Sequence, residues 1–326
     1  MYDICFGSAY ARIFEDTDGP SRVFEFKNKF GEMRHTFLLR EIPMRIDNRT
    51  LYDISTPYGY GGPIILNSSD KDKLMQDFSK AFEDYCRQSG IVSEFVRFHL
   101  TDNTDVRQRY YGQARFVKNN IIVPTDRSYD TVWMDYEHKV RKNVKKAQTY
   151  GLDVVIEQNL NHIDDFLRIY YDTMDRNQAR KYYYFPRSFF EKIASYIPHN
   201  YLFFHILKDD AVISTELVLV SEQYVYSFLG GTDVEFYAMR PNDFLKDAVI
   251  RMCIQTGKRG FVLGGGYNDN DGIYRYKRSF TKADDVPFYV GTKIFDQDTY
   301  DRLVSERMKQ SGQMPDDKDF FPLYRA

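Results

Sequence analysis

The sequence predicts a mixed α/β (α+β) chain of two similar domains in tandem, each a mixed, mostly antiparallel sheet flanked by helices. Segments with strand-like alternation and segments with helical spacing follow one another along the 326 residues. A basic helical pattern ends at Gly151, and the strand and helix pattern then starts again. We therefore expect domains at residues 1–150 and 151–326, with the final strand and helix able to pack on the first domain.

The third observation is a repeated order of glycine loop, helix and strand. Gly62 lies 33 residues before Phe95 in the first half, and Gly231 lies 30 residues before Phe261 in the second. No short repeat accompanies this match. The repeated order indicates two domains of one kind.

In the first half, the clearest element is a helix over residues 69–89. Leu74, Phe78 and Phe82 recur there at helical spacing, and Gly90 ends the helix. The other expected elements of this half are a helix over 8–16, strands at 22–27, 33–42, 92–100 and 115–123, and a basic helix over 134–150.

In the second half, three strands separated by short polar turns predict an antiparallel meander at 201–208, 211–220 and 223–229. Two glycines, a loop and a helix over 242–256 follow this meander. The remaining expected elements are strands at 153–157, 260–263 and 287–295, and helices at 161–176, 187–196, 271–280 and 298–309.

Charge and cysteine content limit the classes of function. The chain carries 45 Lys+Arg against 47 Asp+Glu, so only a local patch can bind a polyanion, and no DNA partner is expected. Cys5, Cys86 and Cys253 lie far apart, which argues against a disulfide framework or a structural zinc site and indicates a reducing compartment. No signal peptide is expected, and the apolar stretch 201–207 is too short to span a bilayer, so the protein is expected to be cytoplasmic.

Common catalytic motifs are missing from the sequence. It has no HExxH, no GxxxxGK(S/T), no GxGxxG that opens a helix and no GxSxG, which argues against zincin, P-loop, Rossmann and hydrolase chemistry. The six histidines show no metal-ligand spacing, and His205 is interpreted as a hydrogen-bonded core residue of a strand. No metal is therefore expected.

Two segments of the second half suit a charged substrate group. Gly230 and Gly231 end a strand before the helix expected from Asn242, whose free backbone amides and dipole favour an anion. Arg240, just before this helix, would add positive charge for a phosphate. The alternative interpretation is that Asn242 only caps the helix and that Arg240 is solvated.

The second segment is 271–280, which follows three consecutive glycines. On a helix, Tyr274, Lys277 and Arg278 share one face, while Tyr276 lies on another. A lysine beside a tyrosine can stabilise an oxyanion or hold a phosphate. The alternative is an amphipathic helix whose basic face is solvated.

Aromatic residues make up 17% of the chain, an unusually high share. Many of them fit two separate cores, and the others gather in loops and at element ends. This distribution favours a groove between the domains for an extended, partly apolar acceptor. Its candidate contacts are Tyr60, Tyr183 and Tyr237, together with Arg176 and Asn177 at the end of an expected helix.

Several segments, in this order and spacing, resemble the FemAB-type acyltransferases. They are Tyr58-Gly59-Tyr60-Gly61-Gly62-Pro63, Glu94-Phe95-Val96-Arg97-Phe98, the basic run 138–147, the segment 170–177, and Gly264-Gly265-Gly266 leading to the aromatic–Lys–basic–x–Phe segment 276–280. The resemblance spans nearly the whole chain and implies two GNAT-like domains in tandem.

Members of this family transfer an acyl group to an amine. Some use aminoacyl-transfer RNA to extend the peptide of a peptidoglycan precursor, and others resemble acyl-coenzyme A-dependent enzymes of cell-surface glycan pathways. By this resemblance, Lys277 matches the lysine of the family's late motif, near the reacting carbonyl or a substrate phosphate. The usual GNAT pyrophosphate loop is not matched, because residues 238–242 occupy its place, and no long charged helical hairpin is present.

The function that we predict is N-acyl transfer to an amine of a cell-wall or surface-polysaccharide precursor. Lys277 and backbone amides near Leu229 and Gly230 would stabilise the oxyanion, and Glu216 is the candidate base acting through water. Tyr274 or Tyr276 would protonate the leaving group, and Arg240 and Arg278 would hold phosphates.

Acyl-coenzyme A is the expected co-substrate, with no tightly bound cofactor, because the chain lacks a broad basic surface. The alternatives are an aminoacyl-transfer RNA-dependent enzyme that builds peptidoglycan cross-bridges and a non-catalytic glycan- or peptide-binding module on the same fold. The acceptor is expected to be a small molecule or a glycan precursor, with at most peripheral contact to a lipid-linked form. The basic helix could contact a polyanion, although such faces are usually solvated.

Overall fold

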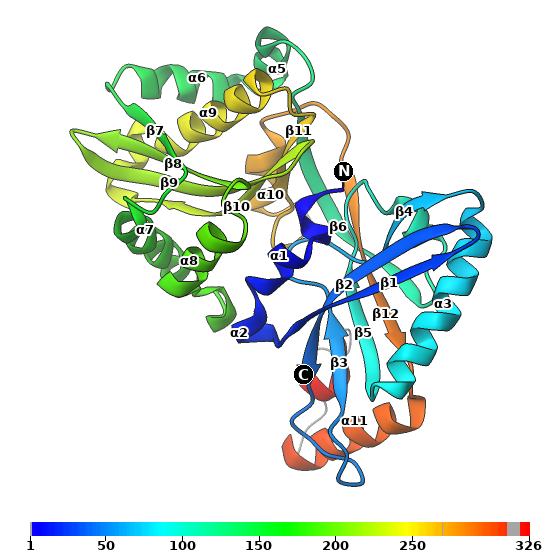
Figure 1. Ribbon diagram of the computed structural model, residues 1–326. Helices are drawn as coiled ribbons and strands as arrows, with labels where there is room; N and C mark the ends of the chain where they lie inside the picture. The colour runs from blue at the N-terminus through cyan, green and yellow to red at the C-terminus, as the bar shows by residue number, and fades with distance from the viewer. Residues whose placement is uncertain (1, 269, 312–319) are drawn as a thin grey trace. The chain divides into compact units, whose positions relative to one another are not determined.

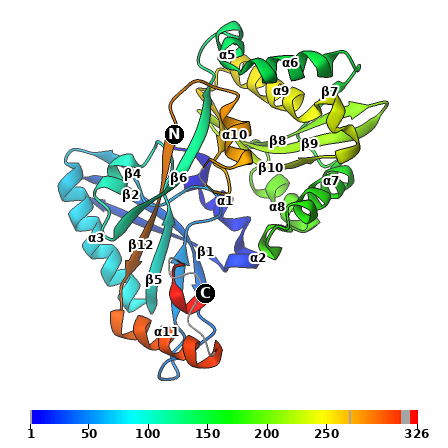
Figure 2. The same cartoon turned by 180° about the vertical axis from the view of Figure 1, so that it is seen from behind.

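The chain divides into two compact units (Figures 1 and 2). The computed structural model describes every residue except 1, 269 and 312–319. Residues 118–287 form one unit, here called the inserted unit. Residues 2–117 and 288–326 form the other, here called the split unit. Each is a mixed α/β structure, which confirms the predicted fold class.

The units do not divide at residue 150, where the sequence placed the boundary. Helix α6 (His138–Gln148) ends shortly before Gly151, yet it packs on helix α9 (Pro241–Gln255) within the inserted unit. Its apolar face is buried in the core of that unit and consists of Val140, Val144 and Ala147. The sequence pattern shows where a helix ends, but it does not show which core that helix joins.

The inserted unit is built on a sheet with the strand order β6, β11, β10, β9, β8, β7. These strands are β6 (Gln113–Pro124), β7 (Asp153–Glu157), β8 (Tyr201–Lys208), β9 (Ala211–Val220), β10 (Tyr224–Thr232) and β11 (Gly260–Gly264). Neighbouring strands are antiparallel except β10 and β11, which are parallel. The predicted meander is present as β8, β9 and β10.

Helices cover both faces of this sheet (Figure 1). One face carries α9, α6 and α5 (Tyr129–Asp135), and the other carries α7 (Ile163–Arg176) and α8 (Arg187–Tyr196). The single helix expected over 134–150 is replaced by α5 and α6. The helices are separated because Glu137 N–H donates to the carbonyl of Ser279 at 2.8 Å and the buried Tyr136 hydroxyl donates to Asp247 at 3.1 Å. These tertiary contacts override the helical pattern.

The split unit contains a sheet with the order β1, β2, β3, β5, β12, and β4 also pairs with β2. Its strands are β1 (Ser21–Asn28), β2 (Gly31–Glu41), β3 (Tyr52–Ser55), β4 (Ile64–Ser68), β5 (Ile91–Arg97) and β12 (Val286–Ile294). Helix α3 (Lys71–Gln88) packs Leu74, Phe78 and Phe82 into the core of this unit, as its spacing predicted. Helix α11 (Gln297–Ser311) follows β12.

Short elements account for most of the remaining differences from the sequence prediction. β3 and β4 were not predicted, because their four and five residues are too few for a clear alternation. The helix expected over 8–16 is two short helices. The short helical segments are η1 (Ile4–Phe6), α1 (Ser8–Arg12), α2 (Glu15–Asp18), α4 (Thr104–Gln108), η2 (Lys181–Tyr183), η3 (Val234–Met239), α10 (Gly272–Arg278) and η4 (Leu323–Arg325). Among the described residues, no helix has both the length and the apolar character needed to cross a bilayer.

Candidate active site

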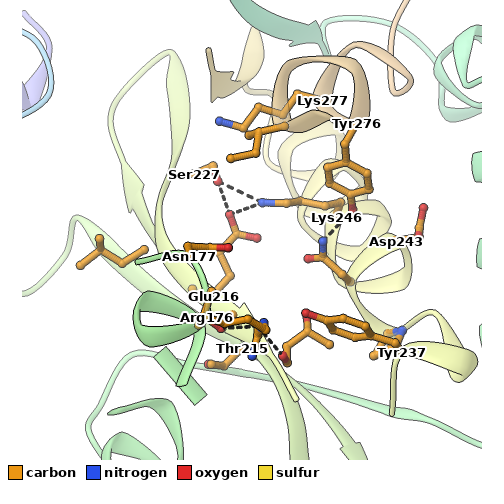
Figure 3. Close-up of a pocket in the computed structure, with 18 of the residues that line it drawn as sticks. Arg176, Asn177, Thr215, Glu216, Ser227, Tyr237, Asp243, Lys246, Tyr276 and Lys277 are labelled. Carbon is orange, nitrogen blue, oxygen red and sulfur yellow. Dashed lines mark hydrogen bonds and ion pairs between the residues drawn. The ribbon is translucent and has the colours of Figure 1, made fainter. Parts of the chain in front are cut away.

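A pocket of about 490 Å³ opens in the inserted unit beside the second half of β10 (Figure 3). Its walls come from β9, β10, the end of α7, η3, the start of α9, and α10. Many of the residues that the sequence analysis named line it, namely Arg176, Asn177, Glu216, Gly230, Gly231, Tyr237, Arg240, Asn242, Tyr276 and Lys277. The fold thus brings segments that are distant in sequence around one space.

The pocket lies where β10 and β11 separate. The two strands pair over Tyr224–Tyr226 only, whereas β10 continues to pair with β9 as far as Thr232. A β-bulge between Ser227 and Leu229 interrupts the register of β10 at this point. Leu229 and Gly230 line the pocket, so the backbone edge of β10 after the bulge borders the space where a substrate can bind.

A buried carboxylate and a lysine form one wall of the pocket. Glu216 in β9 is 3% exposed, and its Oε1 accepts hydrogen bonds from Lys246 Nζ at 2.6 Å and from the Ser227 hydroxyl (Figure 3). Lys246 Nζ also donates to Ser227 Oγ at 3.0 Å. The second carboxylate oxygen, Glu216 Oε2, is buried and has no hydrogen-bond partner among the described residues. Because an unpaired buried acceptor is costly, this oxygen is suited to a donor group of a substrate.

Sequence reasoning missed Lys246 and Ser227. Lys246 lies four residues after Asn242 in α9, so both share one helix face, and both line the pocket. Around it, α9 buries Leu245, Val249 and Ile250. A lysine in such an apolar helix, at helical spacing from a predicted site residue, is the signal that could have revealed it.

Lys277 in α10 also lines the pocket, and its Nζ donates to the carbonyl of Gly265 at 2.7 Å. Burial, followed by the nearby cations of Lys246 and Lys118, lowers the pKa of Lys277 to about 7. This lysine can therefore exchange a proton near neutral pH, which an ordinary surface lysine does not do.

Tyr276 and Asn242 connect α10 to the start of α9. The Asn242 side-chain amide donates to the Tyr276 hydroxyl oxygen at 2.9 Å. Burial raises the pKa of Tyr276, as do the nearby charges of Asp243 and Glu216, so the hydroxyl keeps its proton at neutral pH. The alternative interpretation that Asn242 only caps α9 is wrong, because the helix begins at Pro241 with Arg240 as its N-cap residue.

No side chain fits at the two glycines near the end of β10, Gly230 and Gly231. A Cβ at Gly231 would lie 2.3 Å from Thr173 Oγ1 and 2.8 Å from the Ile169 carbonyl oxygen of α7. A Cβ at Gly230 would lie 2.5 Å from the carbonyl oxygen of Thr215 in β9. Close packing of backbone therefore requires both glycines, whatever ligand the pocket binds.

Arg176, Asn177 and Tyr237 lie at the opposite side of the pocket from Lys277 (Figure 3). The Arg176 guanidinium donates to the Thr232 carbonyl at 3.3 Å and lies 5.7 Å from the centre of the Tyr237 ring. Tyr237 is 44% exposed, which leaves part of its side chain accessible to a ligand.

Four of the predicted site residues do not line this pocket. The Tyr274 hydroxyl donates to the Asp285 carboxylate, and the Tyr183 ring packs against Tyr182 in η2. Tyr60 belongs to the split unit, where its ring contacts His99 and Phe288. The fourth, Arg278, points into an adjoining hollow.

That hollow lies between α6, α9 and α10. It shares Arg240, Asp243, Gly272 and Tyr276 with the pocket. Four cationic side chains line it and outnumber the carboxylates of Glu137 and Asp243; they are Lys139, Arg240, Arg275 and Arg278. Such a surface can hold the phosphates of a substrate that reaches into the pocket.

Residues 135–278 match a family model, that of the acetyltransferase (GNAT) domain. They include the separated strands and every residue of the pocket. This match confirms the GNAT-like character that the sequence predicted for these residues, and it supports an acyltransferase, as the sequence predicted.

The whole fold resembles solved structures at very low sequence identity. FemX has a TM-score of 0.69 and 14% identity, covering 90% of this chain and 92% of that chain. L-PGS from Bacillus licheniformis has a TM-score of 0.55 and 11% identity, covering 89% and 92%. A tandem GNAT protein from the clavulanic acid biosynthesis pathway has a TM-score of 0.51 and 8% identity, covering 83% of both chains. At these identities the likeness shows the fold alone.

No curated protein sequence matches the chain.

Proposed function

We propose that this protein is an N-acyltransferase that moves an acyl group from acyl-coenzyme A to an amine of a cell-wall or surface-polysaccharide precursor in the cytoplasm. The observation that carries the proposal is the arrangement of Glu216, Lys246 and Lys277 around one pocket of a GNAT domain. In this arrangement a carboxylate can accept a proton, and a cation in the same pocket can stabilise a developing oxyanion.

In the proposed reaction, the neutral acceptor amine attacks the carbonyl carbon of the thioester. A carbon–nitrogen bond forms, and the carbon–sulfur bond breaks as the tetrahedral intermediate collapses. The proton lost by nitrogen passes through water to Glu216 Oε2, the oxygen left without a partner among the described residues. Lys246 holds the other oxygen and so fixes the carboxylate in place.

Lys277 and Tyr276 complete the proposed mechanism. Lys277, in its charged form, and the β10 backbone near Leu229 and Gly230 stabilise the oxyanion. The Tyr276 oxygen already accepts a hydrogen bond from Asn242, so its own proton is available for the leaving thiolate. We assign this step to Tyr276 rather than Tyr274, because Tyr274 does not line the pocket.

We propose acyl-coenzyme A as the donor because cationic side chains lie next to the pocket. Arg240, Arg275, Arg278 and Lys139 can bind the phosphates of coenzyme A, beside the N-terminus of α9. We propose that the acceptor binds on the other side, near Arg176, Asn177 and Tyr237. The chain has a net charge of −2, which gives the larger polyanion transfer RNA no general attraction.

An aminoacyl-transfer RNA donor is the alternative, and the exposed basic face of α6 favours it. Lys142, Lys145 and Lys146 are all exposed on that helix. Calorimetric titration with coenzyme A and with charged transfer RNA separates the two donors. Saturable binding of coenzyme A with ribonuclease-resistant activity supports our assignment, whereas ribonuclease-sensitive activity supports the alternative.

Lys277→Met tests the proposed mechanism. Loss of an oxyanion-stabilising cation should lower kcat by about 10²–10³-fold. Circular dichroism should show an unchanged fold, and the matched control Lys309→Met, on the exposed face of α11, should keep full activity. Wild-type turnover by Lys277→Met would refute the role of Lys277.

A further inference from the structure

Three potential metal ligands meet on the α7 side of the inserted unit. Glu157 ends β7, His162 immediately precedes α7, and His205 lies within β8. Val155 of β7 pairs with His205, and Glu157, two residues later, lies on the same face of the sheet. Strand pairing therefore brings together residues whose spacing in the sequence shows no ligand motif.

The distances suit a small cation. Glu157 Oε1 lies 3.4 Å from His205 Nε2, and Glu157 Oε2 lies 3.1 Å from His162 Nδ1. One ligand atom of each residue lies within 4.8 Å of those of the other two. A tetrahedral zinc ion with bonds of about 2.0–2.1 Å separates its ligand atoms by about 3.3 Å, so small side-chain rotations suffice to bind it.

His205 Nε2 is the observation that points to a ligand. The His205 residue is 0% exposed, and Nε2 has no hydrogen-bond partner among the described residues. The other ring nitrogen, Nδ1, lies 2.8 Å from Thr215 Oγ1. If Nδ1 donates its proton to Thr215, the lone pair of Nε2 faces the carboxylate of Glu157. In that tautomer, the two electron-rich atoms at this distance repel each other unless a cation lies between them.

We infer that Glu157, His162 and His205 bind a divalent transition-metal ion, for which Zn²⁺ is the best match. Two imidazoles and one carboxylate suit Zn²⁺, whereas Mg²⁺ and Ca²⁺ prefer oxygen ligands alone. Three protein ligands leave one position for water. The His162 side chain is 33% exposed, which gives the ion a route of entry.

The site is separate from the proposed acyl transfer, yet one residue connects the two. Thr215 lines the acyl-transfer pocket and also holds His205 Nδ1. Glu157 additionally accepts a hydrogen bond from the His162 backbone at 3.2 Å, at the start of α7. The bound ion therefore fixes β7, β8 and α7 to one another and orients Thr215 through His205.

The test uses the full chain without a histidine tag, stripped of metal by a chelator. Equilibrium dialysis against ZnCl₂ should give one equivalent of zinc, and Co²⁺ should give the visible absorption of a low-symmetry site. His162→Ala and Glu157→Gln each remove a ligand and should weaken zinc binding by more than about 100-fold, and Thr215→Val should weaken it by about 10–100-fold. The matched control His199→Ala, an exposed histidine, should bind as the wild type does.

Thermal unfolding provides a second readout. Zinc should raise the Tm of the wild type and of His199→Ala, and should leave the Tm of His162→Ala unchanged. His162 is partly exposed, so its substitution should preserve the fold. Substoichiometric zinc, preferential binding of Mg²⁺ or Ca²⁺, or equal weakening by His162→Ala and His199→Ala would overturn the inference.

Discussion

Lys277 shows how a single partly buried residue can favour chemistry over stability. Its pKa of about 7 in the folded chain lies below the ordinary lysine value of 10.5. Between these two pH values the unfolded chain binds a proton that the folded chain does not, so this residue makes the protein more stable as the pH rises. Below pH 7 both states carry the proton, and the full cost of burying the charge remains.

Lys277→Met should therefore stabilise the protein while it removes activity. We expect a gain on the order of 2–4 kcal/mol at pH 6.5, after the loss of the hydrogen bond to Gly265. This gain should shrink as the pH rises from 7 towards 10. Urea unfolding at several pH values measures it, with Lys309→Met as the control. A stability difference that does not change with pH would contradict the lowered pKa of Lys277.

The sequence predicts individual site residues correctly when they belong to a motif or share a helix face with one. Lys277 and Arg240 were identified in this way, and both line the pocket. Lys246 was missed because its importance comes from Glu216, 30 positions away, with which it pairs only after folding. Tyr274 was misplaced because helical spacing put it beside Lys277, while its hydroxyl donates to Asp285.

At the scale of elements, the contact of β10 with α7 depends on the absence of a side chain. Gly231→Ala should force these elements apart and lower the free energy of unfolding by about 1–3 kcal/mol. Gly272→Ala is the matched control, because its Cβ would meet nothing within 4 Å at the start of α10. Chemical denaturation compares them. Equal free energies of unfolding for the two variants would mean that α7 moves away from β10 without loss of stability.

Arg240, just before α9, has a backbone conformation that affects stability and a charged side chain that we expect to bind the substrate, and one substitution can separate the two effects. Arg240 has a φ of 63°, in the left-handed region that glycine adopts more easily. Arg240→Gly should keep or raise the Tm, since it relieves the backbone, while it weakens the affinity for coenzyme A by about tenfold through loss of a charged hydrogen bond. Thermal shift and calorimetry measure the two effects. A lower Tm with unchanged affinity would reverse this assignment.

Most helices and strands followed from periodicity, because each carries its own apolar face. α3 is an example, since its buried residues are those that the spacing predicts. The break between α5 and α6 could not be predicted in this way, because it depends on the carbonyl of Ser279 and on Asp247, more than 100 residues away. The same limit applies to the boundary expected at residue 150.

At the scale of the whole molecule, each unit depends on different parts of the chain. The split unit has a cluster that joins Leu51 and Val92 to Tyr300, Leu303 and Tyr324, and the Tyr324 hydroxyl lies 2.7 Å from Ser93 Oγ. The described residues after 287 thus complete a core begun by residues 2–117.

A fragment of residues 118–287 should fold by itself, whereas a fragment of residues 2–117 should not. The second fragment lacks β12 and exposes apolar residues such as Val92, which residues 288–326 cover in the full chain. Cooperative thermal unfolding, followed by circular dichroism, tests both fragments. A cooperative transition in residues 2–117 alone would show that the later residues are dispensable for that core.

The return of the chain after residue 287 has a consequence for synthesis on the ribosome. The segment that carries the GNAT pocket is complete as soon as residue 287 has left the exit tunnel, while the first hundred residues still lack their last strand. The split unit, whose first residues are synthesised first, therefore completes its fold last. A premature stop or a proteolytic cut after residue 287 should leave the pocket of the inserted unit intact and should unfold residues 2–117, at the opposite end of the sequence.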